Sequence, residues 1–407
     1  MSPSRLFAAI WIVWSSSAGA AGAELPVAAP AVGLVAALEQ APLVMVAEVA
    51  SVRRGTGPHA HVATVSVERA LVGEAPSGEL RVTWDELAAS RRPRLQAGEV
   101  ALLGLEPVVG KDASLFRLAS SGRAWWTAPD SASVNVLGHY LALAPSERTG
   151  PTGVRHLLTL SARAPAPLAR SAAHRLANRA SHGDAISGAD LAALMVTALA
   201  RADADGVARS LLQWVRGNPS AELVRALDVA IVRGDPAPAV YAARALLPEG
   251  LPDASWAALA DSSIEAEREV VARYAPATQG DTLASLAGPG ETSHQVRAAA
   301  VERLATVAFD AAVVVAALGD EHPVVRMAAA EALAARGDTE VPTLRRVAFE
   351  GTPREQQTAV TGLRIWGCRA AAAVLHEIVE DHPSEGMRRI AAIALGEPLG
   401  EVHPPHP

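Results

Sequence analysis

The most regular feature of the chain is a short pattern of small and apolar positions that recurs along its second half. The stretch Asp320–Val347 contains the pattern once: Asp-Glu-His-Pro-Val-Val-Arg leads into alanines and Leu333, then Gly337, then a second apolar run. Pro323 suits the first turn of a helix, where its missing N–H costs nothing, and Gly337 suits a helix end. The stretch therefore predicts two helices joined by a tight turn.

The pattern returns at spacings close to thirty residues, which predicts a tandem repeat. Arg326 has counterparts at Arg297 and Arg268, each 29 residues further upstream. Ala329 and Leu333 lie three and seven positions after Arg326, so they share one helical stripe. Helix pairs this short cannot bury their apolar faces alone, and we expect them to stack. The counterparts are Ala300, Ala242, Ala359 and Ala391 for the alanine, and Leu304, Leu246, Leu363 and Leu395 for the leucine.

An alternation of apolar and polar positions comes before the repeats and predicts strands. Glycines and prolines separate these alternating segments, as expected of turns. The segment 34–39 predicts one or two helical turns in front of them. Six short strands in about one hundred residues predict a small antiparallel barrel or sandwich. The expected strands are 43–52, 61–71, 80–84, 100–105, 115–118 and 123–127.

These patterns predict a multidomain β + α chain. We expect a small β domain at 31–128, a junction at 129–151 and stacked helical repeats at 152–397. A Pro- and His-rich tail at 398–407 follows the repeats. The alternative for the helical part is one long Ala-rich bundle whose periodicity is accidental.

The repeat resembles the HEAT-like repeats first recognised in phycobilin lyases. The shared pattern is a loop with Asp and Pro, then Val-Arg, two Ala positions, Ala-Leu and Gly-Asp, and it is clearest over 293–396. The resemblance implies an armadillo-type α-solenoid. A repeat pattern specifies a fold and says little about chemistry, so a lyase-like enzyme is an alternative function.

The β domain resembles the netrin-like, OB-type barrel shared with tissue inhibitors of metalloproteinases. The segments that carry this resemblance are 41–49, 67–73 and 98–103. Those inhibitors present an N-terminal cysteine to the metal of the protease, whereas this domain contains no cysteine. Protease inhibition therefore does not carry over, and an immunoglobulin-like sandwich is the structural alternative.

The first 23 residues have the pattern of a secretory signal peptide. Arg5 comes before the apolar run Leu6–Trp14, and Ala21-Gly22-Ala23 supplies a cleavage site of small residues. Nine residues span about 14 Å as a helix, half of a bilayer core, and no later apolar run reaches the length of a membrane span. We therefore expect cleavage after Ala23 and a periplasmic or extracellular protein without a stable membrane span.

Charge and cysteine content narrow the choice of partners and chemistry. The chain has 36 Lys and Arg against 43 Asp and Glu, a formal net charge of −7. Nucleic-acid binding requires a basic surface, so we expect no nucleic-acid partner. Cys368 is the single cysteine, which excludes an internal disulfide, and a lone cysteine among apolar neighbours is usually a small buried hydrophobe.

The sequence contains no convincing catalytic or metal motif. His376-Glu377 begins like a zinc-protease helix, but Glu380 occupies the position of the second histidine, and His382 would lie about 120° away around a helix. We interpret the remaining candidates as loop histidines, because isolated imidazoles make poor metal sites; these are His59, His61, His403 and His406. We therefore predict no catalytic residue, metal or cofactor.

Tryptophans concentrate aromatic surface in the β domain. Trp125 and Trp126 are adjacent and must point to opposite faces of a strand. We expect one of them in the core and the other exposed or packed on the helices. Together with Trp84, an exposed ring would permit a glycan-binding envelope protein, which is a further alternative function.

The repeat register also predicts a surface for a protein partner. Glu331 lies five positions after Arg326 and therefore on a different side from the packing stripe. Its counterparts are Glu302, Arg273 and Thr361, which should form a row with about 10 Å between packed helices. A row of mixed charges suits selective docking. We predict an exported, non-enzymatic scaffold that binds a protein along its second-row helices; the alternative is a merely solvated face.

The arginines that mark the repeat have two interpretations. Arg268, Arg297 and Arg326 would form a basic ladder for an acidic partner if their side chains were free. We favour the other interpretation, in which each arginine bonds to a carbonyl or an aspartate of a neighbouring loop and stabilises the repeat.

Overall fold

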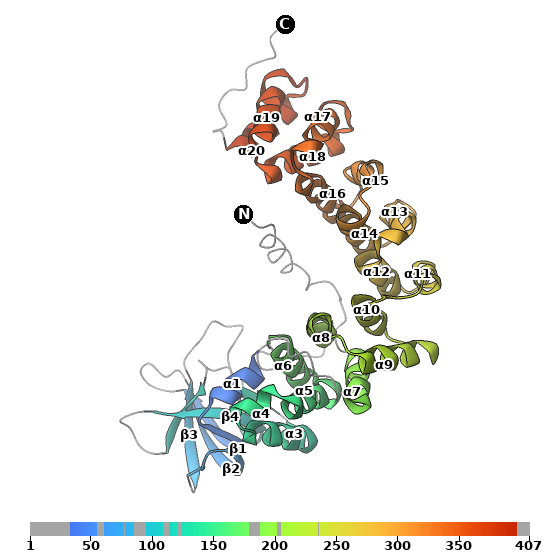
Figure 1. Ribbon diagram of the computed structural model, residues 1–407. Helices are drawn as coiled ribbons and strands as arrows, with labels where there is room; N and C mark the ends of the chain where they lie inside the picture. The colour runs from blue at the N-terminus through green and yellow to red at the C-terminus, as the bar shows by residue number, and fades with distance from the viewer. Residues whose placement is uncertain are drawn as a thin grey trace. The chain divides into compact units, whose positions relative to one another are not determined.

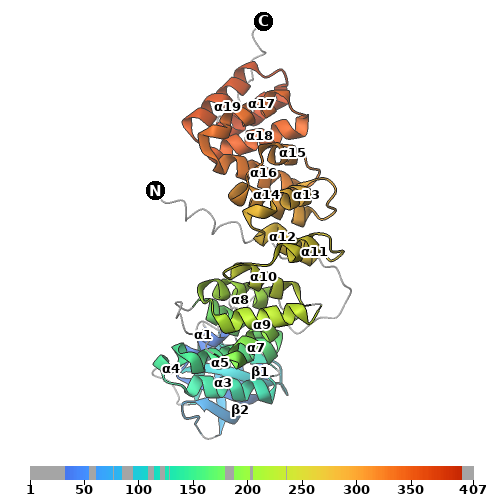
Figure 2. The same cartoon turned by 45° about the vertical axis from the view of Figure 1, so that its right-hand side comes forward.

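The computed structural model describes residues 33–54, 61–76, 78–84, 95–108, 114–119, 124–127, 129–178, 188–201, 205–234 and 236–396. The chain divides into two compact units, the first ending at Pro129 and the second beginning at Asp130. Figures 1 and 2 draw the chain from two directions. The predicted signal peptide at 1–23 and the tail at 398–407 lie outside the described residues.

The first unit is a small β barrel. Strand β1 pairs antiparallel with both β2 and β4, β2 pairs antiparallel with β3, β3 runs parallel to β5, and β5 pairs antiparallel with β4, so five strands close a ring. Strand β6 also pairs with β4. The elements are α1 (Leu34–Gln40), β1 (Leu43–Arg54), β2 (His61–Val72), β3 (Glu79–Trp84), β4 (Val100–Pro107), β5 (Leu115–Leu118) and β6 (Trp125–Thr127).

Alternate side chains of the strands fill the barrel, as the period of two requires. The core includes Met45, Val65, Leu80, Leu103 and Trp125. A Cβ at Gly104 of β4 would lie 2.7 Å from the Cβ of Ala124 and 3.0 Å from Leu38 of α1. Only glycine therefore lets these segments pack against that strand.

The second unit consists of helices in two rows (Figure 1). Helices α6, α8, α10, α12, α14, α16, α18 and α20 follow one another in what we call the second row, each packed against the next. Before this array stand α3 (Ser131–Ala142) and α4 (Pro145–Thr149). The array comprises α5 (Pro151–Arg163), α6 (Ala166–Ala177), α7 (Ala189–Leu199), α8 (Asp205–Gly217), α9 (Ala221–Val232), α10 (Pro238–Leu246), α11 (Asp253–Ala260), α12 (Glu265–Tyr274), α13 (Gly280–Ala287), α14 (His294–Val307), α15 (Ala311–Ala317), α16 (Pro323–Ala335), α17 (Val341–Glu350), α18 (Pro353–Trp366), α19 (Arg369–Asp381) and α20 (Glu385–Leu395).

Local sequence signals set the ends of the second-row helices. Ser293, Thr352 and Ser384 are N-caps whose hydroxyls accept a backbone N–H in the first turn. Pro323 occupies the first turn of α16, as predicted. Gly337 follows that helix with φ of +77°, a conformation that side chains other than glycine rarely adopt.

Small residues and leucines form the core between the helices. Ala300, Leu304, Ala329 and Leu333 have no more than 1% of their surface exposed. These positions are the predicted packing stripe, so the prediction that Leu333 belongs to the core is confirmed. Among the helices that the structure describes, none is long and apolar enough to cross a membrane.

Candidate functional site

The four residues predicted to form a binding row lie on four successive helices of the second row. Arg273 belongs to α12, Glu302 to α14, Glu331 to α16 and Thr361 to α18. Each of these helices packs against the next, and both views draw them as consecutive members of one row (Figures 1 and 2). The structure therefore brings the four positions onto neighbouring helices at equivalent places in the repeat.

The side of α16 that contains Glu331 faces away from the packing stripe. Val324, Met327 and Ala335 are exposed and Glu331 is half-buried, whereas Ala329 and Leu333 are buried. The positions 324, 327, 331 and 335 are spaced three, four and four residues apart, so they share one face of the helix. We call this face, with its equivalents on α12, α14, α18 and α20, the row face.

Two carboxylates on the row face lie close enough for one charge to affect the other. Glu302 and Glu331 form no ion pair within the described residues. Arg273 is bound instead to Glu269, with its Nε 2.7 Å from the carboxylate. Desolvation raises the pKa of the Glu302 carboxyl, although its side chain is exposed. Desolvation, and then the charge of Glu302, raise the pKa of Glu331. The effect of Glu302 on the pKa of Glu331 places the two acidic groups near one another, and the charge of Arg273 partly offsets the raised pKa of Glu302.

Apolar side chains on the row face were missed by the sequence prediction. Val324 and Met327 on α16, Ile365 on α18 and Ile393 on α20 are 49%, 42%, 43% and 56% exposed. They occupy row-face positions when the helices are aligned through Arg326, Gln356 and Arg388. Met327 and Ile365 lie four residues from Glu331 and Thr361, and this spacing was the signal that could have revealed them. Val324 lies seven residues before Glu331, and Ile393 is itself the counterpart of Glu331 on α20.

The opposite edge of the same helices contains the repeated arginines. Arg268 donates two hydrogen bonds to Glu291, at 2.7 and 3.0 Å, and Arg297 donates two to Asp320, at 2.8 and 2.9 Å. Arg326 donates to the carbonyl oxygens of Asp320 and Glu321. The arginines thus tie each helix to neighbouring loops, and the interpretation as a ladder for an acidic partner is wrong.

The carboxylates of these buried pairs have lowered pKa values. Burial pushes the pKa of the Asp320 carboxyl upward, but the hydrogen bonds from Arg297 and from the backbone N–H of His322 outweigh it, and the pKa is lowered. The same balance, with Arg268 and Ser293 as donors, lowers the pKa of Glu291. The loop edge is therefore built from fully partnered charges.

Other predicted residues have structural surroundings. Cys368 is half-buried rather than fully buried, because it caps α19: its sulfur accepts the N–H of Ala371 and its thiol donates to Asp338, 3.0 Å away. His382 is buried and contacts the carbonyl oxygen of Ala348. Glu377 forms an ion pair with Arg345 on α17.

Histidines and tryptophans of the first unit offer no aromatic platform among the described residues. His61 stacks on Trp84 with ring centroids 5.4 Å apart; His59, His403 and His406 lie outside the described residues. Trp84, Trp125 and Trp126 are all buried. Of the two alternatives for the second tryptophan of the pair, an exposed ring is therefore wrong. The described residues also contain no group of three or more His, Cys, Asp or Glu side chains placed to hold a metal.

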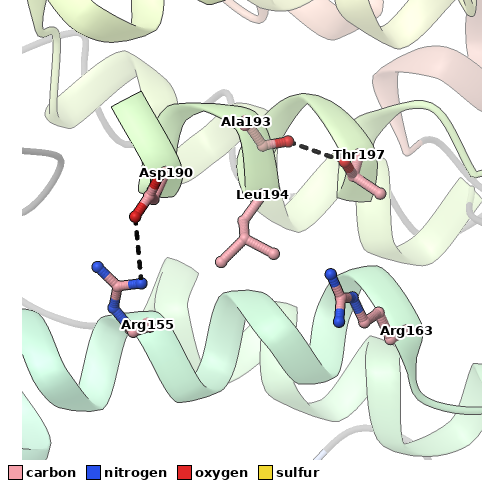
Figure 3. Close-up of a pocket in the computed structure, with 6 residues that line it drawn as sticks. All are labelled: Arg155, Arg163, Asp190, Ala193, Leu194 and Thr197. Atoms are coloured by element: carbon pink, nitrogen blue, oxygen red, sulfur yellow. Dashed lines mark hydrogen bonds and ion pairs between the residues drawn. The ribbon is translucent and has the colours of Figure 1, made fainter. Parts of the chain in front are cut away.

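Two depressions lie away from the row-face residues described above. One, of about 310 Å³, is lined by Arg155 and Arg163 of α5 and by Asp190, Leu194 and Thr197 of α7 (Figure 3). Its ion pair, between Arg155 and Asp190, is long at 3.9 Å and well exposed. The other, of about 540 Å³, lies beside α13, α14 and α15. Both are open; the acidic and basic groups that line them are Arg155, Arg163 and Asp190 in the first and Asp281 and Asp310 in the second.

The comparison with known protein families concerns the helical unit. A family model described as HEAT repeats matches residues 282–354, a segment that begins in α13 and ends in α18. It includes Glu302, Val324, Met327 and Glu331. The match supports the HEAT-like repeats predicted from the sequence. No curated protein matches the chain.

Proposed function

We propose that this protein is an exported, non-enzymatic scaffold that binds a protein partner along the row face of its second-row helices. The observation that supports the proposal best is the position of Arg273, Glu302, Glu331 and Thr361 at equivalent places on four packed helices. HEAT repeats commonly mediate protein interactions, and a match to them spans the middle of this row. Stacked helices of this kind offer long surfaces suited to a partner.

The architecture belongs to the same proposal. We infer that the helical unit is an armadillo-type α-solenoid, since helices of two rows alternate along its sequence. We also infer that the barrel is netrin-like and OB-type, since its ring order β1-β2-β3-β5-β4 is that of a five-stranded Greek-key barrel. The barrel would then act as a second contact module. The likeness of the repeats to those of phycobilin lyases stays a prediction from the repeat pattern.

Crosslinking with affinity purification from the envelope of the native host tests the binding. The variant Arg273→Glu/Glu302→Lys/Glu331→Lys reverses the row face and should release the captured partner. Val229→Ser/Val232→Ser removes exposed apolar side chains from α9, in the other row, and should leave capture unchanged. Full retention of the partner by the reversed variant, with its helical circular dichroism intact, would refute binding at this face.

Export is tested separately. The protein secreted by the host should begin at Glu24, because the expected cleavage follows Ala23. N-terminal sequencing decides the point, and a cytosolic protein that begins at Met1 would exclude export.

A further inference from the structure

The row face is divided into acidic, apolar and basic parts. Glu302 and Glu331 occupy α14 and α16, whereas further along the row exposed Arg354 on α18 stands at the position of Val324 and exposed Arg389 on α20 at the position of Met327. Neither arginine forms an ion pair within the described residues. The sign of the unpaired charge therefore changes along the row.

Exposed apolar side chains lie between and beside these charges. The structure leaves seven large apolar side chains exposed within its described residues. Four of them, Val324, Met327, Ile365 and Ile393, belong to the row face of three successive helices. Scattered surface hydrophobics are ordinary, but such a concentration on one face of one row indicates a surface that becomes covered.

We propose that this part of the row face binds a segment of another protein that combines apolar side chains with a basic end and an acidic end. The proposal rests on the proposed function and names the chemistry of its partner. Basic side chains would lie over Glu302 and Glu331, and acidic side chains over Arg354 and Arg389. Apolar side chains would cover Met327 and its neighbours.

Charge complementarity favours this occupant over a uniformly charged one. Glu302 is exposed, Glu331 is half-buried, and neither forms an ion pair within the described residues. The negative charge of Glu302 also acts unfavourably on that of Glu331, so cations from a partner would reduce this repulsion. A purely basic segment would be repelled by Arg354 and Arg389, and a purely acidic one by the two glutamates. Opposite charges at the two ends also fix the direction in which a segment lies along the row.

A random library of 16-residue peptides displayed on phage, selected against the full chain, tests the proposal. The enriched peptides should contain apolar residues together with both Lys or Arg and Asp or Glu. Their affinities are then measured by fluorescence anisotropy. Met327→Ser/Ile365→Ser and Glu302→Lys/Glu331→Lys should each weaken binding at least about tenfold. The matched control Val229→Ser/Val232→Ser should bind like the wild type, and thermal unfolding verifies that every variant is folded.

The other outcomes overturn the proposal in distinguishable ways. If only Arg273→Glu abolished peptide binding, the binding site would lie near α12. That result would refute the partner chemistry proposed here and would leave the proposed function standing. Binding that is sensitive only to Val229→Ser/Val232→Ser, or no peptide that depends on the row face, would count against both. A dimer in sedimentation velocity that dissociates in Met327→Ser/Ile365→Ser would identify a second copy of the chain as the occupant and refute the proposed partner.

Discussion

The two sides of the second-row helices differ in whether their charged side chains form ion pairs. On the loop edge of α12 and α14, Arg268 and Arg297 are bound to carboxylates that are almost buried, and those charges are paired inside the fold. On the row face of the same helices, Glu302 and Glu331 lie near each other and form no ion pair within the described residues, although the charge of Arg273 partly offsets the raised pKa of Glu302. The row face therefore has two carboxylates that no ion pair occupies among the described residues.

This difference predicts that one set of residues determines the stability of the fold and another set determines partner binding. A buried pair is costly to break because removing one partner strands the other charge away from water. An exposed charge contributes little to folding, and two like charges side by side reduce stability. Residues of the loop edge should therefore control unfolding, and residues of the row face should control binding.

The largest effect should come from Arg297→Ala. The side chains of Arg297 and Asp320 are 5% and 12% exposed, so the variant leaves a nearly buried carboxylate without its cation. We expect a loss of about 3–5 kcal/mol in the free energy of unfolding. Urea unfolding followed by circular dichroism measures it. Arg326→Ala removes only bonds to carbonyl oxygens and should cost clearly less; equal losses would mean that the pair with Asp320 is not the cause.

Leu333→Ala should destabilise the array from its core. Leu333 is fully buried, and loss of its side chain leaves a cavity that should cost about 2–5 kcal/mol. The helical repeats should melt before the barrel, so far-UV circular dichroism of the helices should be lost at a lower temperature than the amide hydrogen-exchange protection of the barrel strands. Unchanged unfolding of the helical signal would contradict the repeat register.

A smaller effect should appear at mildly acidic pH, at His322, the N-cap of α16. His322 stacks on His294 with ring centroids 3.6 Å apart, and desolvation together with that neighbour lowers the pKa of His322 below 6.5. The folded state thus takes up the proton less readily than the unfolded state, so stability present above pH 6.5 is lost as pH falls through the lowered pKa. His322→Asn keeps an N-cap acceptor and should reduce the loss between pH 7.5 and 5 by less than about 1 kcal/mol. Identical pH profiles would exclude this histidine as a source of the acid sensitivity.

The smallest effect should be a gain in stability on the row face. Glu331→Gln removes one of two neighbouring negative charges and should stabilise the fold at pH 7 by at most about 1 kcal/mol. The pKa of Glu331 is raised in the folded state, so the gain should vanish as pH falls through that pKa and the wild-type carboxyl becomes neutral. Urea unfolding at pH 7 and pH 4 measures the difference. A loss at pH 7 would mean that Glu331 has a stabilising partner and is not available for binding.

The sequence allowed much of the helical array to be predicted. The spacing of Arg268, Arg297 and Arg326, with alanine and leucine after each, gave the register, because a period of 3.6 residues fixes which side of a helix is buried. The same register gave the row of Arg273, Glu302, Glu331 and Thr361. The alternating strands were also predictable, although the order in which they close a ring depends on contacts between distant segments.

Other features were not predictable because they depend on residues far apart in the chain. Met327 and Ile365 look like core residues in an Ala-rich helix until their positions around the helix are compared with those of Glu331 and Thr361. The cap at Cys368 depends on Asp338, thirty residues away in another loop. The burial of Trp126 likewise could not be read from the alternation along one strand.

Methionine oxidation gives the most direct test of binding at the row face. Met327 is 42% exposed, whereas Met45, Met195 and Met387 are buried, so one exposed thioether reports on the face and three serve as internal references. Hydroxyl-radical footprinting with mass spectrometry would compare the full chain alone with the chain bound to its captured protein. We predict that binding slows oxidation of Met327 several-fold and leaves the buried methionines unchanged. Oxidation of Met327 at the free rate while the partner is fully bound would contradict binding at this face.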